Sequence, residues 1–422
     1  MKIAVVGGGS TYTPELVDGF ARLFPDVTEL ALVDPATERL GVVGPFARRI
    51  FAHHGHAGSV TYTDDLDAGL SDAEVVVIQL RVGGQRARIS DETFPLECGC
   101  VGQETTGAGG LAKALRTVPV VLDVAERARR LAAPHAWIVD FTNPVGIVTR
   151  ALLDAGHRAV GLCNSAIGFQ RQLAGLFGVG PDRVRLDHAG LNHLTWIRKV
   201  EVDGVDRLPE LLDSPGLREV AAGSGLPPEL LRTLRAIPSY YLHYFYCTDE
   251  AVRAQASGPQ RAEQVLEIER TLLEMYADPA LDHKPALLEQ RGGAYYSEAA
   301  AALVTSLLTG DGGHHYVDVR NDGTLAGLPA EAVVEVPAVV DTAGAHPVPV
   351  DPLPPEMLGL VQAVTAYEVL TIEAARTGDR RTALRALLAN PLVRQWDVAV
   401  PLLDALLEAN RRHLPRFFAA DA

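Results

Sequence analysis

The sequence has few cysteines, no long apolar run and no basic leader. Its 4 cysteines, Cys98, Cys100, Cys163 and Cys247, are too few and too scattered for a disulfide framework in 422 residues, so we expect reduced thiols. A membrane helix needs about 18 or more consecutive apolar residues. The first residues, MKIAVVGGGS, enter a predicted strand directly instead of forming a cleavable leader. These absences predict a soluble cytoplasmic protein.

Positive charge is also scarce. The chain has 38 Lys and Arg residues against 53 Asp and Glu residues, which gives a net charge of −15 at pH 7. Nucleic acids and anionic membranes would be repelled, so neither is expected as a main partner. An anionic small substrate would need a local basic pocket. The length leaves room for a cofactor-binding domain and a second lobe.

The first half of the chain alternates short Val/Ile/Leu runs with amphipathic segments, a pattern typical of a parallel sheet covered by helices. The predicted strands of this half span residues 2–6, 29–33, 75–79, 136–140 and 159–162. Later strands are expected only at 316–319 and 333–339, with long helices at 257–276 and 356–377.

This pattern predicts an α/β fold with two lobes. The first is a Rossmann-type domain with a parallel sheet, at residues 1–195. The second is a mostly helical α+β lobe, at residues 196–422. The arrangement expected is similar to that of lactate and malate dehydrogenases. No repeat or flexible linker separates the lobes, so we expect them to pack tightly.

The segment IAVVGGGSTYTPELV places glycines between a strand and a helix. Glycines let the backbone approach a pyrophosphate, and the amides at a helix N-terminus favour its negative charge. We assign Gly7, Gly8, Gly9, Ser10 and Thr11 to cofactor binding, although Tyr12 occupies the usual place of a third glycine. Asp34 follows the second strand and is expected to bind the ribose hydroxyls of NAD rather than NADP. The alternative is an ordinary turn followed by a surface aspartate.

Other polar motifs follow the third, fourth and fifth predicted strands: LRVGGQRARISDE, FTNPVG and LCNSAIG. Parallel sheets bind ligands outside the carboxyl ends of their strands, so these segments should meet in one crevice. We therefore add Arg81 and Asn143 to the cofactor site. The stretch GCVGQETTGAGG between them is polar and glycine-rich, which predicts a loop that wraps around a ligand.

These motifs, together with GLNHL, YYLHYF, RGGAYYSEAA and RNDGTLAGLP, follow the order and approximate spacing found in glycoside hydrolase family 4. The chain is identified as a member of this family of NAD- and metal-dependent glycosidases. The Cys-Asn pair resembles the 6-phospho-β-glucosidase branch, because the α-acting branch usually carries Asp after the Cys.

The resemblance implies that Cys163 and His193 bind a divalent metal, usually Mn²⁺. A thiolate and an imidazole would leave coordination sites open for substrate hydroxyls. Without the resemblance, a single buried Cys or His is more often a packing residue.

The implied reaction differs from that of glycosidases with two carboxylates. NAD oxidises C3 of the sugar, a base removes the C2 proton, the aglycone leaves C1, water adds, and NADH reduces C3 again. Tyr241 matches the family's base, and its phenol would need a nearby cation to ionise at neutral pH. In the alternative interpretation, the tyrosines of this segment form an aromatic core.

The resemblance also places Arg88 and Arg261 near the sugar phosphate, with Asn143 between cofactor and sugar and Asn164 on the substrate hydroxyls, where we count it as catalytic. Arg291 either pairs with phosphate or holds its loop, and Arg261 could instead be a solvated helix residue.

Two departures from the family pattern make the sugar specificity open. Ser165 to Gly168 replace the usual Val-Pro-Ile-Asn, which predicts a looser loop beside the metal, and His243 replaces a common arginine. The competing functions are cleavage of another, unphosphorylated glycoside, an NAD-dependent sugar or hydroxy-acid dehydrogenase, and an NAD-sensing protein. The resemblance implies that residues 1–195 form the NAD-binding domain and that the lobe at 196–422 serves substrate, metal and oligomerisation. A homodimer or homotetramer is expected from the family.

Overall fold

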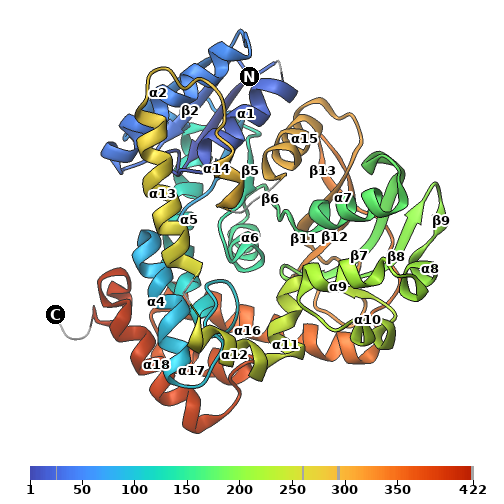
Figure 1. The fold of residues 1–422 in the computed structure, drawn as a ribbon. Helices are drawn as coiled ribbons and strands as arrows, with labels where there is room; N and C mark the ends of the chain where they lie inside the picture. Colours follow the sequence, from blue (N-terminus) through green and yellow to red (C-terminus); the bar gives the residue numbers. More distant parts are fainter. Residues whose placement is uncertain (25, 259–260, 292–294, 420–422) are drawn as a thin grey trace.

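The computed structural model describes residues 1–24, 26–258, 261–291 and 295–419 (Figure 1). Its strands join in one 13-stranded sheet, whose main path runs β10-β8-β7-β12-β11-β6-β5-β4-β1-β2-β3. The strands are β1 (Lys2–Val6), β2 (Glu29–Val33), β3 (Ser59–Thr63), β4 (Val75–Ile78), β5 (Trp137–Asp140), β6 (Ala159–Gly161), β7 (Val184–Leu191), β8 (Leu194–Val202), β9 (Val205–Asp206), β10 (Ile237–Pro238), β11 (Gly313–Arg320), β12 (Val333–Asp341) and β13 (Gly344–Pro347).

The first six strands form a parallel unit in the order β3-β2-β1-β4-β5-β6. This is the strand order of the dinucleotide-binding fold, so the α/β prediction is confirmed. Alternate residues of β1 enter different cores because strand side chains point to opposite faces. Ile3 and Val5 pack in the core with α1 (Thr13–Leu23) and α2 (Thr37–His53), whereas Ala4 and Val6 pack in the other.

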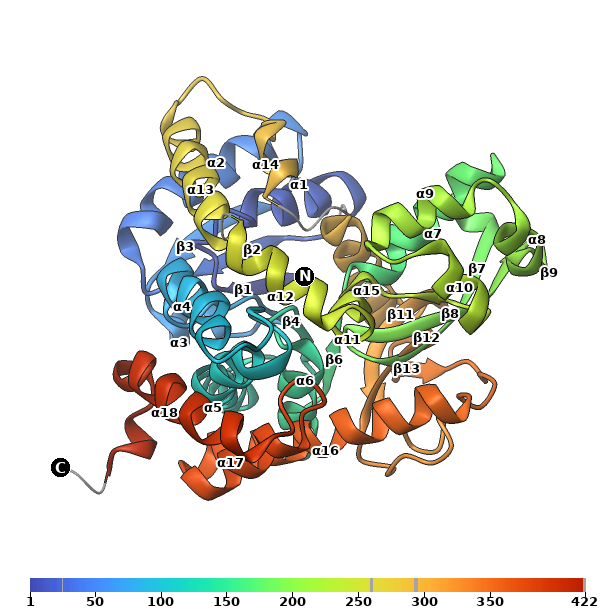
Figure 2. The ribbon, with the colours of Figure 1, turned by 60° about the horizontal axis from the view of Figure 1, so that its bottom comes forward.

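The second core contains the apolar face of α5 (Gly107–Leu131), with α6 (Val145–Asp154) and the C-terminal helices α16 (Pro355–Thr377), α17 (Arg380–Ala389) and α18 (Trp396–Ala409). Figure 2 shows α16 and α17 lying across α5 on this side of the molecule. Helix α16 is long and apolar enough to cross a membrane by length and hydropathy alone. It contacts α5, α6 and α17, so we interpret it as a core helix.

The second half of the chain extends the same sheet with antiparallel strands. Asp318 of β11 pairs with Gly161 of β6, and β12, β7 and β8 follow in order. The predicted strands at 316–319 and 333–339 are therefore parts of longer strands. The proposed boundary at 195/196 falls inside β8, which pairs along its length with β7.

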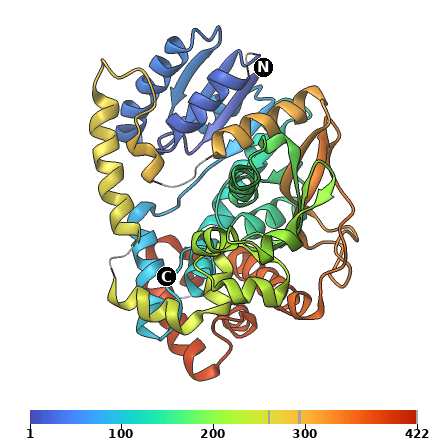
Figure 3. The same ribbon diagram turned by 45° about the vertical axis from the view of Figure 1, so that its right-hand side comes forward.

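Helices of the second half also cover the first. Helix α13 (Arg261–Ala277) contacts both α2 and α4 (Gly84–Glu97) and runs along one side of the molecule (Figures 1 and 3). The predicted helix at 257–276 corresponds to the end of α12 (Thr248–Ser257) and to α13, while residues 259–260 lie outside the described part. The remaining helices are α3 (Leu66–Leu70), α7 (Ser165–Phe177), α8 (Leu208–Asp213), α9 (Leu217–Ser224), α10 (Pro228–Leu234), α11 (His243–Tyr246), α14 (Leu287–Gln290) and α15 (Tyr296–Thr309).

Two loop predictions need correction. Gly107 to Gly110 were expected in a ligand-wrapping loop, but they form the buried first turn of α5. Ser165 to Gly168 were expected in a loosened loop, but they begin α7, where the Gly168 amide donates to the Asn164 carbonyl. Small residues at helix starts allow close packing, so glycine content alone did not indicate a loop in the first case.

Candidate active site

A cleft of about 900 Å³ opens at the carboxyl ends of β1, β2, β4 and β5. Both halves of the chain contribute to its walls. The sequence-predicted residues that line it are Gly7, Gly9, Ser10, Asp34, Arg81, Arg88, Asn143, Asn164, His193, Tyr241, Arg261 and Arg291. The predicted convergence of the strand-end motifs is therefore observed.

The glycine turn after β1 forms one end of the cleft. Gly7 has φ +94°, and a Cβ there would lie 2.6 Å from the carbonyl oxygen of Gln79, so only glycine fits. The Asp34 carboxylate accepts hydrogen bonds from the backbone amides of Gly9 and Ala36, each at 2.9 Å. These bonds fix the carboxylate at the end of β2, where it faces the cleft.

Two residues of the predicted cofactor motif point elsewhere. A Cβ on Gly8 would lie 2.7 Å from that of Leu32, so Gly8 serves packing against β2. Thr11 is fully buried, and its hydroxyl accepts a 2.8 Å hydrogen bond from Nε of Arg291.

Arg291 lies at the glycine turn. Its Nη2 is 3.5 Å from the Ser10 hydroxyl and 2.9 Å from a carboxylate oxygen of Glu269, and the guanidinium lies over the Tyr12 ring. Burial lowers the pKa of Arg291, while Glu269 favours its charged form. The next three residues of its motif, 292–294, lie outside the described part of the chain.

Cys163 follows β6 and is only 4 % exposed. Burial raises the pKa of its thiol well above the ordinary value, and the carboxylate of Glu335 raises it further. The backbone amide of Ser165 and the side chain of Asn192 act in the opposite direction as hydrogen-bond donors. Cys163 itself is not among the residues that line the cleft, in contrast to the adjacent Asn164.

His193 does line the cleft, from the two-residue connection between β7 and β8. Its φ of +65° is a left-handed conformation that costs a non-glycine residue about 1–2 kcal/mol. Nδ1 is 3.1 Å from the Thr105 hydroxyl, and the ring stacks on Tyr241 with 3.6 Å between centroids. Burial lowers the pKa of His193 to about 4, so the imidazole is neutral at pH 7, the form that binds metals.

Cys163 and His193 thus offer the donor types of the predicted metal site. Within the described residues, no group of three or more His, Cys, Asp or Glu side chains has an arrangement that could hold a metal ion. A metal held here would have an incomplete protein shell, which agrees with a site that leaves positions for a ligand.

Tyr241 lies in a short 3₁₀ turn, Tyr240–Leu242. Its ring contacts the rings of His193 and Tyr240. Burial raises the pKa of its phenol well above 10.0, and the neighbouring Tyr240 and Cys163 act in the same direction. The phenol is therefore protonated at neutral pH unless a cation lies nearby. His243, one turn later, bonds to the Gly225 carbonyl at 2.8 Å and is not a lining residue.

Cations surround one buried carboxylate in the cleft wall. Glu104 bonds to Arg81, to Nζ of Lys113 at 2.6 Å and to Nε of Arg88 at 3.1 Å. Burial alone would raise the pKa of Glu104, but the three cations hold it well below its usual range. Burial also lowers the pKa of Lys113 to about 7. The group carries more positive than negative charge, so this wall can attract an anion despite the acidic chain.

Glu92 links Arg88 to the start of α13. One of its carboxylate oxygens is 2.8 Å from Nε of Arg88, and the other accepts a 2.9 Å bond from the backbone amide of Ala262. Arg261 precedes Ala262, is exposed, and donates to the Gln290 carbonyl at 2.8 Å. The structure therefore brings Arg88 and Arg261 to the same cleft from different halves of the chain.

Asn143 lies after β5, and its side-chain oxygen is buried without a hydrogen-bond partner in the described residues. It lines the cleft between the glycine turn and the Cys163 segment. A buried amide oxygen that lacks a partner costs free energy, which is typical of a site that a ligand completes.

Sequence profiles decide the family. The profile described as "Family 4 glycosyl hydrolase" matches residues 2–179, and that of the "Family 4 glycosyl hydrolase C-terminal domain" matches residues 188–393. The chain belongs to glycosyl hydrolase family 4. The relatives identified also confirm the predicted 6-phospho-β-glucosidase branch.

Among curated family 4 relatives, the probable 6-phospho-β-glucosidase of Bacillus subtilis (strain 168) is 41% identical, covering 99% of this chain and 98% of the relative. The 6-phospho-β-glucosidase of Escherichia coli (strain K12) is 35% identical over 99% and 97%. A phospho-α-glucosidase of Clostridium acetobutylicum (strain ATCC 824) is 28% identical, covering 97% and 98%. A solved structure of the Thermotoga maritima 6-phospho-β-glucosidase with manganese, NAD⁺ and glucose-6-phosphate has a TM-score of 0.90 and 35% identity, covering 98% of this chain and 99% of that one.

Several cleft residues of this family 4 chain were missed by sequence reasoning, namely Gln79, Glu104, Lys113, Tyr240, Tyr244, Glu269 and Tyr296. Lys113 carried a usable signal, because a lysine within the apolar run GLAKAL is unusual unless it has a buried partner. Glu269 carried none, since its partners Arg39, Gln85 and Arg291 are 230, 184 and 22 residues away along the chain.

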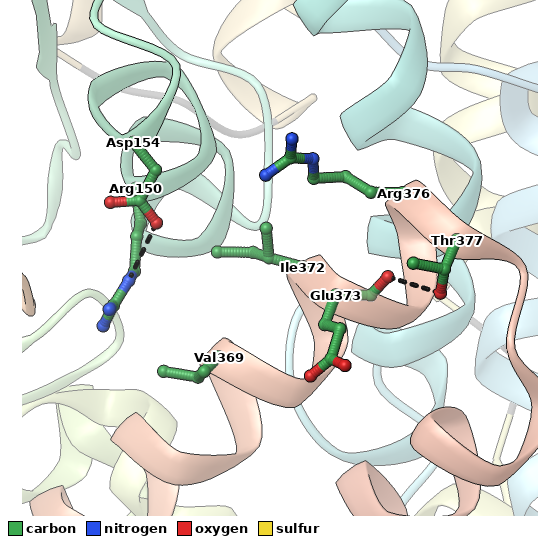
Figure 4. Close-up of a pocket in the computed structure, with 7 residues that line it drawn as sticks. All are labelled: Arg150, Asp154, Val369, Ile372, Glu373, Arg376 and Thr377. Carbon is green, nitrogen blue, oxygen red and sulfur yellow. Dashed lines mark hydrogen bonds and ion pairs between the residues drawn. The ribbon is translucent and has the colours of Figure 1, made fainter.

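A second cavity, of about 370 Å³, lies between α6 and α16 (Figure 4). Arg150 and Asp154 of α6 form an ion pair at 3.4 Å, and Val369 and Ile372 of α16 face the same space. None of the sequence-predicted site residues lines it, so the functional assignment rests on the larger cleft.

Proposed function

We propose that this protein is an NAD- and Mn²⁺-dependent 6-phospho-β-glucosidase. The observation that carries the proposal is the single cleft that joins the glycine turn and Asp34 to His193, Tyr241, Arg88 and Arg261. Relatives of 35–41% identity across nearly the whole chain carry this activity by name. We also propose a cytoplasmic location and a homodimer or homotetramer.

The residues fit both proposed cofactors. For NAD, Gly7 and Gly9 leave space in the cleft, and the Asp34 carboxylate is already oriented by two amides. For a divalent metal, His193 is neutral and oriented by Thr105, and the Cys163 sulfur has hydrogen-bond donors that favour a thiolate. When bound, NAD supplies a hydride acceptor for C3, and the metal supplies a Lewis acid for the resulting ketone.

The chain's own residues then hold the sugar and move the proton. Arg88 and Arg261 bind the 6-phosphate, and Asn143 and Asn164 orient the ring hydroxyls. Tyr241 accepts the proton from C2. Burial disfavours its phenolate, and a metal held by Cys163 and His193 would supply positive charge that favours it. The aglycone leaves C1 with a proton, and water then adds to C1 while a proton returns to C2. Return of the hydride to C3 restores the sugar and completes the hydrolysis.

Arg291 and Arg81 serve the cofactor side in this proposal. Arg291 contacts the hydroxyls of Ser10 and Thr11, which places its charge at the turn expected to bind the pyrophosphate. Arg81 follows β4 and shares Glu104 with Arg88, so Glu104 links the end of β4 to the proposed phosphate site.

The test is release of the aglycone from a chromogenic β-glucoside 6-phosphate and from its unphosphorylated equivalent, in D₂O with NAD, Mn²⁺ and a reductant. We expect turnover of the phosphorylated compound only, deuterium at C2 of the product and no accumulation of NADH. Cleavage of only the neutral glycoside would contradict the phosphate role of Arg88 and Arg261. Steady net reduction of NAD would favour a dehydrogenase instead.

A further inference from the structure

A buried chain of hydrogen bonds lies beside the two proposed metal ligands. Glu335 of β12 is 1 % exposed, and its Oε1 is 2.7 Å from Nε2 of His188 on β7. Its Oε2 accepts a 2.9 Å hydrogen bond from the Asn192 side chain. His188, Glu335 and Asn192 are not among the residues that line the cleft.

Glu335 is placed by the sheet itself. It lies opposite Gly190 in the register of β12 and β7, and Asn192 and His193 form the connection that follows β7. One oxygen of the Glu335 carboxylate bonds to a side chain of β7, and the other bonds to a side chain of this connection. The carboxylate therefore fixes the position of the connection relative to the sheet. Few exposed loops have such support, because their polar groups bond to water instead.

Both carboxylate oxygens of Glu335 therefore help to hold the proposed metal ligands in position. Asn192 precedes His193, whose left-handed backbone requires a well-held turn. The Asn192 side chain, which donates to Glu335, also acts as a hydrogen-bond donor toward the Cys163 sulfur. One amide thereby relates the positions of both ligands.

We propose that Glu335 is a positioning residue of the metal centre, acting through Asn192 to hold the Cys163 thiolate and the His193 imidazole at the spacing that one divalent ion requires. The inference rests on the proposed function, and specifically on a metal bound by Cys163 and His193. Residues that hydrogen-bond to metal ligands orient them and tune their basicity.

The test compares Glu335→Gln with wild type, using the full-length protein. The substitution keeps the shape but replaces one acceptor oxygen by a donor and removes the charge. We expect the affinity for Mn²⁺ to fall about 10- to 100-fold. In the Co²⁺-substituted protein, the cobalt–thiolate charge-transfer absorption should weaken or shift. NAD binding should be unchanged, because Glu335 is remote from the glycine turn in the sheet order.

Glu331→Gln is the matched control, since Glu331 precedes the same strand but is exposed. It should leave both the Mn²⁺ affinity and the cobalt absorption unchanged. Asn192→Ala tests the next link of the chain and should weaken the same absorption, which keeps the inference testable if Glu335→Gln does not fold.

The outcomes separate the inference from the proposed function. A wild-type cobalt–thiolate absorption that is unchanged in both variants would overturn the positioning role alone. Absence of this absorption from wild type would overturn the metal site, and the positioning role with it.

Discussion

The affinity of the cleft for Mn²⁺ should rise about tenfold for each pH unit in the neutral range. The reason is that only one of the two proposed ligands carries a proton at neutral pH. Burial holds the pKa of the Cys163 thiol well above its ordinary value, so the metal must displace a proton from it. Burial lowers the pKa of His193 to about 4, so the imidazole has no proton to lose.

Binding thus releases one proton. Between about pH 6 and about pH 8 the dissociation constant should fall about 100-fold, which is about 2.7 kcal/mol. The assay is titration of the apoprotein with Mn²⁺, following the electron paramagnetic resonance signal of the free ion, in buffers that do not bind metal. The sign follows from the thiol: protons compete with the metal, so acid weakens binding.

Cys163→Ser is the control, and it should bind Mn²⁺ weakly with little dependence on pH. If the affinity of wild type for Mn²⁺ does not change with pH, the claim that the Cys163 thiol is protonated before binding is refuted. A plot of the logarithm of Mn²⁺ affinity against pH with a slope of two below about pH 6.5 would show that His193 titrates as an ordinary histidine. It would refute the reasoning from the burial of His193.

Three further perturbations test the cleft and the core. Tyr241→Phe keeps the stacked ring on His193 but removes the base, so kcat should fall about 100- to 10,000-fold in the aglycone assay with Mn²⁺ binding unchanged; near-normal turnover would exclude the base role. Arg88→Lys keeps the charge but loses the planar fork, so KM for the phosphorylated substrate should rise about tenfold or more, with a smaller effect on kcat. An equal loss for a neutral glycoside would argue against phosphate binding. Burial raises the pKa of the Glu368 carboxyl to about 8 from an ordinary 4.5. The protonated carboxyl therefore makes its full contribution to the free energy of unfolding below about pH 4.5, and this contribution is lost as the pH rises toward 8. Glu368→Gln should therefore stabilise the protein at about pH 7 by up to about 3 kcal/mol in urea unfolding, with no gain in stability at about pH 4. As a control, substitution of the exposed Glu373 by Gln should change stability little at either pH.

The parallel half of the fold was predictable because its signals are local. Each strand from 2–6 to 159–162 is a short apolar run that is followed by glycines or polar residues, and all five occur within a residue of the predicted bounds. β3 was missed because its sequence, SVTYT, has only one buried residue and so lacks an apolar run. β7 and β8 were missed because polar residues interrupt their apolar runs, and their pairing depends on a two-residue connection that contains no glycine.

The candidate site was predictable as a set of strand ends, but its internal pairing was not. Convergence follows from the parallel sheet, since consecutive strand ends share one edge. The partner of Arg291 at Thr11 is 280 residues away, and that of Asn192 at Glu335 is 143 residues away, so no local pattern indicates either contact. The Asn192–Glu335 contact arises only when the antiparallel strands extend the sheet beyond β6, and the Arg291–Thr11 contact only when the segment after α14 packs against the glycine turn.

The junction between β6 and β11 has a consequence for how the cleft keeps its dimensions. The two strands meet at Asp318 opposite Gly161, and a Cβ on Gly161 would lie only 2.8 Å from that of Asp318. The parallel and antiparallel parts of the sheet therefore meet in close backbone contact, at the strand that precedes Cys163. In the proposed function, this junction would help to set the distance between a hydride acceptor at the glycine turn and a sugar beside Cys163. The relative position of the two reacting groups would then depend on paired strands, and not on the loops around the cleft.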